Sequence, residues 1–428
     1  MKRYIYNYRI NSIKMFLFSS FAFFLPISQK ISTINIGLLL IVSIFDFKKD
    51  KFYFKIGLVL PICLYVLYCV SLLYSSELQT DIVEQKASLL VFPIIFMLYN
   101  NCSENFSSIF KYFVFGCLIA LIICEVNAFY NSFDFINLIF DSRIDKSISY
   151  YNSIQKEENF FFSFHFSSLH QAVYFSMYLL FAITIIFYKN IFKNRLVSYG
   201  LLLFFFLGIF QILNKASLIV LFVVLTLKIY QYMKSKKKVI LSIVLLLITA
   251  VSMFILNPRF KEFSKNNFVI NKAELKIKDY KKIKNKNPNR NTDFRVMLWV
   301  SSVELVKENL IFGIGAGGSD NRLYEAFAVK RQWYDKNEKY HAHNQYLQIL
   351  LDIGLIGFIP FILLFVYFFR FWYFLKDKKL KMITINFILI VAINFLFESM
   401  FERYSGISFF TFFYCLFISF RDREDKVV

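Results

Sequence analysis

Long apolar runs recur along almost the whole chain, and they constrain its fold more than any other feature. Each run approaches the roughly 20 residues that a helix needs to cross ~30 Å of hydrocarbon. Hydrophobic residues fill 57% of the 428 positions, so a soluble protein would lack the polar surface to cover these runs. The sequence therefore predicts an all-α, polytopic membrane protein.

The runs divide into about twelve candidate transmembrane helices. They are 14–28, 31–46, 56–75, 88–100, 112–130, 169–187, 197–213, 216–232, 239–256, 345–369, 382–397 and 405–420. The fourth run is short, and a start near Ile82 is an alternative. The first run follows a basic segment, as in a signal peptide, but no small-residue cleavage site follows it, which favours an uncleaved anchor.

Loop charges predict the orientation of these helices. The loops after the second, sixth, eighth and tenth runs are rich in lysine and arginine, whereas the alternate short loops carry only isolated cations. Basic residues collect in cytoplasmic loops, so we expect both termini in the cytoplasm. The net charge of +21 is then largely a topology signal, and nucleic acid is not an expected partner. The six cysteines lack the paired spacing of a disulfide framework or a metal site.

Three regions follow from this layout. Residues 1–256 hold the first nine spans with an outer loop near 131–168, residues 257–344 form a large periplasmic loop, and residues 345–428 hold the last three spans and a cytoplasmic tail. From Pro258 to Asn344 there are 18 Lys and Arg against 10 Asp and Glu, a net charge of +8. Such a surface suits phosphate-bearing partners, and attraction to the headgroups of membrane lipid is an equal alternative.

All four histidines fall on the predicted outer face. His165 and His170 end the first long outer segment, and His341 and His343 end the second. Histidine is the side chain that titrates near neutrality. The grouping therefore favours a role in proton transfer, although four residues can also group by chance.

The most distinctive stretch is HAHNQYLQILLDIGLIGFIP, residues 341–360. Asn344 stands where the loop enters the predicted tenth span. Gly354 and Gly357 lie about one helical turn apart, and small residues at that spacing allow close helix approach in membranes. We interpret both glycines as packing residues, and a merely interfacial polar role is the alternative for His343.

A second stretch, NTDFRVMLWVSSVELVKENLIFGIGAGG, covers residues 291–318. Its pattern predicts a helix over 293–310, on which Arg295 and Trp299 share one stripe. The glycine-rich end is not a nucleotide-binding fingerprint, because no strand precedes it and no Lys-Ser/Thr follows it.

The order of these motifs resembles the O-antigen ligase and polymerase superfamily. The likeness consists of an Arg-x-x-x-Trp helix, a Gly-Ile-Gly turn, a variable insert and then HNQYLQILLDIGLIG, and it extends more loosely to EQKASLLVFPIIF at 84–96. It implies a GT-C-like glycosyltransferase of the bacterial inner membrane with a periplasmic active site. The implied donor is a polyprenyl-diphosphate-linked glycan, used without metal or other cofactor.

The resemblance also implies roles for individual residues. His343 matches the histidine proposed to act on the acceptor, and Arg295 matches the arginine implied to contact the donor diphosphate. Lys215, in the segment NKAS, stands where the family often has Ser/Thr-Arg-small. Lysine keeps the charge there but lacks the planar fork of arginine. Four further residues are expected to support the site or bind substrate: His341, Asn344, Trp299 and His170.

This chemistry is reasonable on physical grounds. A sugar carbon bearing a diphosphate already has a good leaving group, so the protein must add a base for the acceptor hydroxyl and cations for the diphosphate. Direct displacement would invert the anomeric centre. Polar residues such as Glu125, Gln211 and Glu398 fall in the outer ends of the spans, which favours a cavity open to the outer leaflet.

The acceptor stays open at this point. Transfer to lipid A–core would make the enzyme a ligase of lipopolysaccharide biosynthesis, which is the leading hypothesis. Transfer to another lipid-linked glycan would make it a polysaccharide polymerase, and transfer to a protein hydroxyl an O-oligosaccharyltransferase. A transporter is the alternative of a different class, but neither repeat symmetry nor a midplane charge pair supports it. Lys215 also leaves a non-catalytic chain-length regulator open.

Overall fold

The computed structural model describes residues 2–46, 54–99, 106–233, 294–331 and 338–420, together with single positions between 235 and 244 and residue 335. Helices dominate these residues, and the strands among them are limited to one short pair, as expected of an all-α membrane protein. Most of the predicted ninth span, residues 257–293 of the predicted outer loop and the tail from residue 421 lie outside the described residues.

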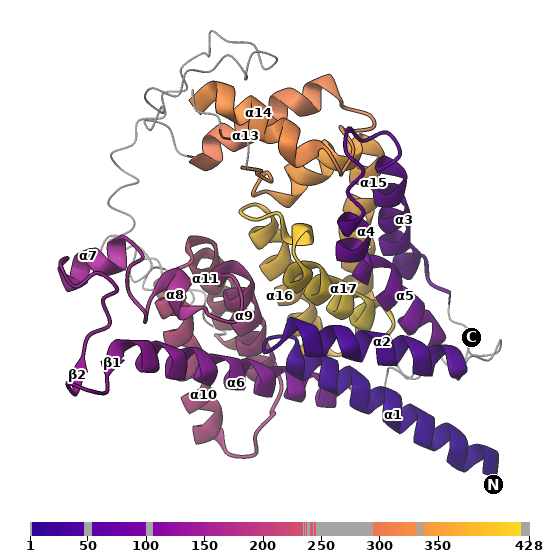
Figure 1. Cartoon of the computed structure of the whole chain (residues 1–428). Helices are drawn as coiled ribbons and strands as arrows, with labels where there is room; N and C mark the ends of the chain where they lie inside the picture. Colours follow the sequence, from indigo (N-terminus) through magenta and orange to yellow (C-terminus); the bar gives the residue numbers. More distant parts are fainter. Residues whose placement is uncertain are drawn as a thin grey trace.

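The elements follow the chain in a simple order (Figure 1). The helices are α1 (Lys2–Phe24), α2 (Gln29–Phe45), α3 (Ile56–Ser71), α4 (Asp81–Lys86), α5 (Ser88–Leu98), α6 (Phe106–Ser132), α7 (Tyr150–Gln155), α8 (Ser163–Phe166), α9 (Ala172–Tyr188), α10 (Arg195–Ile212), α11 (Lys215–Tyr232), α13 (Phe294–Glu308), α14 (Ser319–Arg331), α15 (Gln345–Phe374), α16 (Lys378–Phe395), the 3-10 turn η5 (Met400–Glu402) and α17 (Tyr404–Ile418). Between α6 and α7, β1 (Phe133–Asp134) pairs antiparallel with β2 (Ile139–Phe140).

Three of the described helices are long and apolar enough to cross a membrane. They cover Ser107–Ser132 in α6, Arg195–Ile212 in α10 and Gln345–Phe374 in α15. Shorter apolar helices of 10–17 residues lie in α1, α2, α3, α9 and α17. The chain thus has the helical, apolar character of a membrane protein, and the number of twelve spans stays a prediction.

The centre of the bundle is built around α17. Every residue of this helix from Ser405 to Ile418 is buried, because an apolar sequence without a polar face can only be surrounded by other helices. Aromatic rings fill the space around it. The Phe413 ring lies 4.8 Å from that of Phe181 on α9 and 5.1 Å from that of Phe113 on α6, centroid to centroid, in both cases edge to face.

A lysine side chain is hydrogen-bonded to a backbone carbonyl at each end of the bundle. Lys55, just before α3, donates a hydrogen bond of 2.8 Å to the carbonyl of Ile418 at the end of α17. The neighbouring Gly57 packs against Tyr367 near the end of α15. Lys86 lies at the opposite end, against η5. Lysines thus lie at both ends, and the assignment of the loops to the two sides of the membrane from their charge stays a prediction.

Helices α13 and α14 form a layer beyond the start of α15, at the top of Figure 1. Leu298 and Leu305 of α13 and Leu323 and Phe327 of α14 are buried in a small apolar core. Leu351 of α15 joins the same core. This second core fixes the layer against the end of α15 where the histidines lie.

Helix α15 is interrupted in its middle. Gly354 has φ +60° and ψ −158°, a conformation essentially restricted to glycine. Residues 310–315 fill the break, where they exchange four backbone hydrogen bonds of 2.6–3.3 Å with α15 on either side of the glycine. The predicted unbroken span over 345–369 therefore contains a break, which glycine permits and the loop backbone satisfies. Gly357 stays helical and contacts the side chain of Ile353 in the same helix.

Candidate active site

His341 and His343 lie directly before α15, in a loop that is anchored at its last residue. The Asn344 side chain caps the helix by accepting hydrogen bonds from the backbone N–H groups of Tyr346 and Leu347, at 3.0 and 3.1 Å. Its backbone N–H donates to Ser399 Oγ and its amide donates to the carbonyl of Leu396, both at 3.2 Å. The cap thus ties the start of α15 to the turn after α16.

The residue between the histidines, Ala342, is held from two sides. Its carbonyl accepts a hydrogen bond of 3.1 Å from Trp299 Nε1 of α13, and its N–H donates to Gln348 Oε1 of α15 at 2.7 Å. His343 adopts φ +47°, and non-glycine residues held in this left-handed region concentrate at functional sites. The loop is therefore constrained around the two imidazoles rather than loosely attached.

Both imidazoles face Glu398, a residue of the turn between α16 and η5. The His341 and His343 ring centroids are 4.2 Å apart. His343 Nδ1 lies 3.2 Å from Glu398 Oε2, and His341 Nε2 lies 3.7 Å from Glu398 Oε1. The turn is itself fixed to α15, because the N–H of Phe401 donates to Gln345 Oε1 at 2.6 Å. The structure thus joins two segments far apart in the chain into one cluster.

Glu398 is the charged member of this cluster. Its side chain is only 7% exposed. Burial alone raises the pKa of the Glu398 carboxyl, but the hydrogen bond with His343 and the cationic groups around it, Arg295 among them, hold this pKa below its usual value. Burial, with the nearby His343, lowers the pKa of His341 to about 4. At neutral pH a carboxylate therefore faces an uncharged imidazole at His341.

The two predicted donor-binding cations occupy different elements. Arg295 lies in the first turn of α13 and acts electrostatically on Glu398. Lys215 is the exposed first residue of α11. Close by, Ser217 of α11 is hydrogen-bonded to Ser176 of α9, so Lys215 lies at the end of the bundle where α9 begins. The structure records no direct contact between Lys215 and the His341–His343–Glu398 cluster among the described residues.

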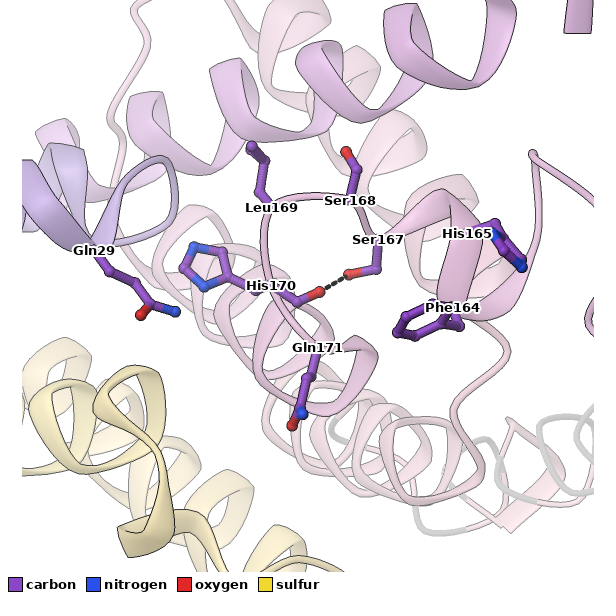
Figure 2. A pocket seen from close by; sticks show the side chains of 8 residues that line it. All are labelled: Gln29, Phe164, His165, Ser167, Ser168, Leu169, His170 and Gln171. Carbon is purple, nitrogen blue, oxygen red and sulfur yellow. Dashed lines mark hydrogen bonds between the residues drawn. The ribbon is translucent and has the colours of Figure 1, made fainter. Parts of the chain in front are cut away.

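His170 precedes α9 and lines a hollow of about 440 Å³ together with Gln29, residues 164–165 and the other residues of 167–171. Figure 2 shows His170 and Gln29 on one side of this hollow and Phe164 and His165 on the other. His170 Nδ1 and Gln29 Nε2 both lie 3.0 Å from Ser405 Oγ. Ser405 lies in the first turn of α17, directly after the turn that carries Glu398, so the start of α17 connects the side chains of the hollow to the segment of the histidine cluster.

A pair of acidic residues lies behind the histidine loop. Gln348 Nε2 donates to Asp320 at 3.1 Å and to Asp352 at 3.0 Å, while Gln348 Oε1 accepts from Ala342. Burial, together with the charge of Glu402, raises the pKa of Asp320 to about 7. Gln348 thus connects a carboxyl that titrates near neutrality to the backbone between the two histidines.

The cluster can also serve as a metal-ligand set. One ligating atom each from His341, His343 and Glu398 lie within 4.8 Å of one another. Two imidazoles with one carboxylate suit zinc and related transition ions. Across the described residues this is the one group of three His, Cys, Asp or Glu side chains with such spacing.

Sequence reasoning alone did not identify several of these residues as members of the site. Glu398 is one of several outer polar residues in the sequence, and 55 positions separate it from His343, so nothing in the pattern pairs the two. Gln348 offers only the weak signal of a polar side chain in an apolar helix. Arg403 is counted among the isolated loop charges, yet it acts electrostatically on His341.

Comparison with known protein families finds a match over the part of the chain that holds most of the site. Residues 200–362 match the family model described as O-antigen ligase. The matched region includes Lys215, Arg295 and the His341–His343 loop, whereas Glu398 lies beyond it. No curated protein matches the chain. Residues 200–362 of the chain are thus similar to the O-antigen ligase family, and this match supports membership of that superfamily.

Proposed function

We propose that the protein is an inverting glycosyltransferase of the O-antigen ligase type. It moves a glycan from a polyprenyl-diphosphate donor to an acceptor hydroxyl at the periplasmic face of the bacterial inner membrane, without a metal. The observation that carries the proposal is the fixed pair of His343 and Glu398, 3.2 Å apart, next to a cation on α13. The family match supports glycosyltransferase chemistry in general.

Glu398 gives His343 the tautomer that a base requires. A buried carboxylate accepts a hydrogen bond only from a nitrogen that carries a proton, so the Nδ1 of His343 is protonated and donates to Glu398. The Nε2 then has a free lone pair for the proton of the acceptor hydroxyl, and Glu398 stabilises the imidazolium that forms. The positive φ of His343 and the fixed backbone of Ala342 keep the ring in this orientation.

The cations serve the other end of the reaction. As the acceptor oxygen attacks the anomeric carbon, the bond to the diphosphate breaks and negative charge grows on the leaving group. Arg295 and Lys215 neutralise this charge, and Arg403 is a third cation near the site. A single displacement of this kind inverts the anomeric centre, and no covalent enzyme intermediate is required.

The hollow beside His170 is suited to a saccharide rather than to a lipid. Its lining presents the amides of Gln29 and Gln171 and two imidazoles, with Phe164 as an apolar face. Small-ligand sites combine a concave surface with a few polar groups that fix orientation. We assign this hollow to a sugar of the donor or of the acceptor, and lipid A–core is the proposed acceptor.

The proposal is tested by comparing His343→Ala with His341→Ala in a reconstituted transfer assay at equal membrane abundance. His343→Ala should abolish transfer while donor binding persists. His341→Ala should lose only about tenfold, less than the ~10²–10⁴ that a general base contributes. Near-normal turnover by His343→Ala would remove the base assignment, and an inactive His341→Ala beside it would transfer the role to His341.

The acceptor requires a separate observation. The surface glycans of a deletion strain distinguish the three possibilities. Loss of all polymer attached to lipid A–core supports the ligase. Loss of long chains alone would indicate a polymerase, and loss of glycoprotein an oligosaccharyltransferase.

A further inference from the structure

We propose that His341, His343 and Glu398 bind a divalent transition ion of the zinc type. This ion reversibly inhibits the enzyme because it binds the Nδ1 of His343, the proposed base. The binding stands on geometry alone. The inhibition rests on the proposed function, because it requires His343 to be the base.

The spacing of the three side chains already suits a small metal ion. Zinc binds nitrogen and oxygen ligands at about 2.0–2.2 Å in tetrahedral geometry, so two of its ligands are roughly 3.3 Å apart. The nitrogen-to-oxygen distances in the cluster are 3.2 Å for His343 and 3.7 Å for His341. Each histidine approaches a different oxygen of Glu398, which leaves room between the three groups for one ion.

The surroundings hold these ligands in place before any ion arrives. Ala342, between the histidines, is bonded through both backbone groups to Trp299 and Gln348. The turn that carries Glu398 is tied to the start of α15 by the bond from Asn344 to Ser399. Groups that fix the orientation of metal ligands strengthen binding, and their loss typically weakens it about 10–100-fold.

The two histidine side chains are partly exposed, which leaves coordination positions on a bound ion open to water. The side chains of His341 and His343 are 19% and 25% exposed, whereas that of Glu398 is 7% exposed. Three protein ligands with open positions form the arrangement of a replaceable ion rather than a closed structural site.

Binding would switch the tautomer of His343. The metal takes the lone pair of Nδ1, so the proton that Nδ1 had shared with Glu398 moves to Nε2, and the imidazole stays neutral. An Nε2 that carries a proton cannot accept another from the acceptor hydroxyl. The ion therefore blocks the reaction without contacting the sugar, and its removal restores the base.

The test uses the full-length protein, purified in lipid nanodiscs and freed of metal with a chelator. Co²⁺ is the spectroscopic probe, because its visible absorption changes when imidazole nitrogens replace water, and Zn²⁺ then competes with it. The variants are His341→Gln and the control Glu308→Gln, which removes an exposed carboxylate at the end of α13, outside both the cluster and the hollow. We expect saturable Co²⁺ spectra for the parent and the control, at least ~10-fold weaker binding for His341→Gln, and no effect of Mg²⁺.

The same samples are assayed for glycan transfer. Zn²⁺ should inhibit the parent and Glu308→Gln, a chelator should restore both, and the half-inhibiting concentration for His341→Gln should rise at least ~10-fold. A Co²⁺ spectrum that does not change with protein, or equal binding by the parent and His341→Gln, would overturn the site. Metal binding without any transferase activity would support the site and overturn the proposed function instead.

Discussion

Replacement of Glu398 by Gln is the sharpest test of the histidine–carboxylate pair. The glutamine side chain has nearly the same shape, so packing in the turn after α16 is preserved. The charge is lost, and the amide can donate a hydrogen bond to His343 Nδ1. That bond would favour the tautomer with the proton on Nε2, which is the wrong one for a base.

The magnitude follows from the burial of the pair. Glu398 is 5% exposed, so water cannot take the place of the missing carboxylate. A general base contributes ~10²–10⁴ in rate, and loss of the orienting acid of a histidine reaches the upper end of that range. We therefore expect the turnover number of Glu398→Gln to fall by ~10²–10⁴, or roughly 3–5 kcal/mol in activation free energy.

The assay is single-turnover transfer from a lipid-linked glycan at saturating acceptor, with protein abundance and melting temperature measured in parallel. Glu398→Asp is the control, because it keeps the charge but moves it about one methylene away from His343. Its rate should lie between those of the parent and Glu398→Gln. If Glu398→Gln stayed within threefold of the parent, Glu398 would not set the tautomer, and the reasoning from the 3.2 Å contact would be refuted.

Three further outcomes are expected from other parts of the site. Arg295→Ala should weaken donor use by ~2–4 kcal/mol, measured as the change in kcat/KM for the donor, because it removes a positive charge at the diphosphate. Lys215→Arg should retain activity, and full activity of Lys215→Ala would remove that position from the site. Asp320 keeps its proton to about pH 7 in the folded protein but loses it at about pH 3.9 in the unfolded chain, so the melting temperature should fall as the pH rises from about 4 to about 7. Asp320→Asn should make the melting temperature less dependent on pH over this range, and an equal slope in the variant would refute the reasoning. Gly354→Ala should lower stability by ~1–3 kcal/mol from backbone strain alone, with Gly200→Ala, whose added methyl meets open space, as the control that should not destabilise in the same melting assay.

The sequence predicts the class of the fold well because its signals are local. Apolar runs depend only on neighbouring residues, and the structure accordingly consists mostly of helices, several of them apolar, while the topology read from the charged loops stays a prediction. The helix α13, Phe294–Glu308, likewise lies where the pattern predicts one over 293–310. The break at Gly354 is different, because its stability depends on the backbone of residues 310–315, which no periodicity in α15 reveals.

Only the part of the site that comes from the motif over residues 291–360 could be predicted from the sequence. His343, Arg295 and Trp299 come from one continuous motif, so a resemblance over residues 291–360 is enough to group them. Glu398 meets His343 only through the packing of α16 against α15, and a single sequence carries no signal of that contact. Asp320 is similar, since its altered pKa arises from burial that the chain acquires only when α14 folds onto α15.

The insertion of residues 310–315 into the break of α15 has a mechanical consequence. Four backbone hydrogen bonds join the α13–α14 layer to a helix that is long and apolar enough to cross a membrane, and each backbone group left unpaired in an apolar setting costs several kcal/mol. The layer is therefore coupled to α15, and a tilt of its helices would be transmitted to α15 on both sides of Gly354. If the protein uses the proposed lipid-borne donor, we expect that donor to enter from the side, between helices, rather than by displacement of this layer.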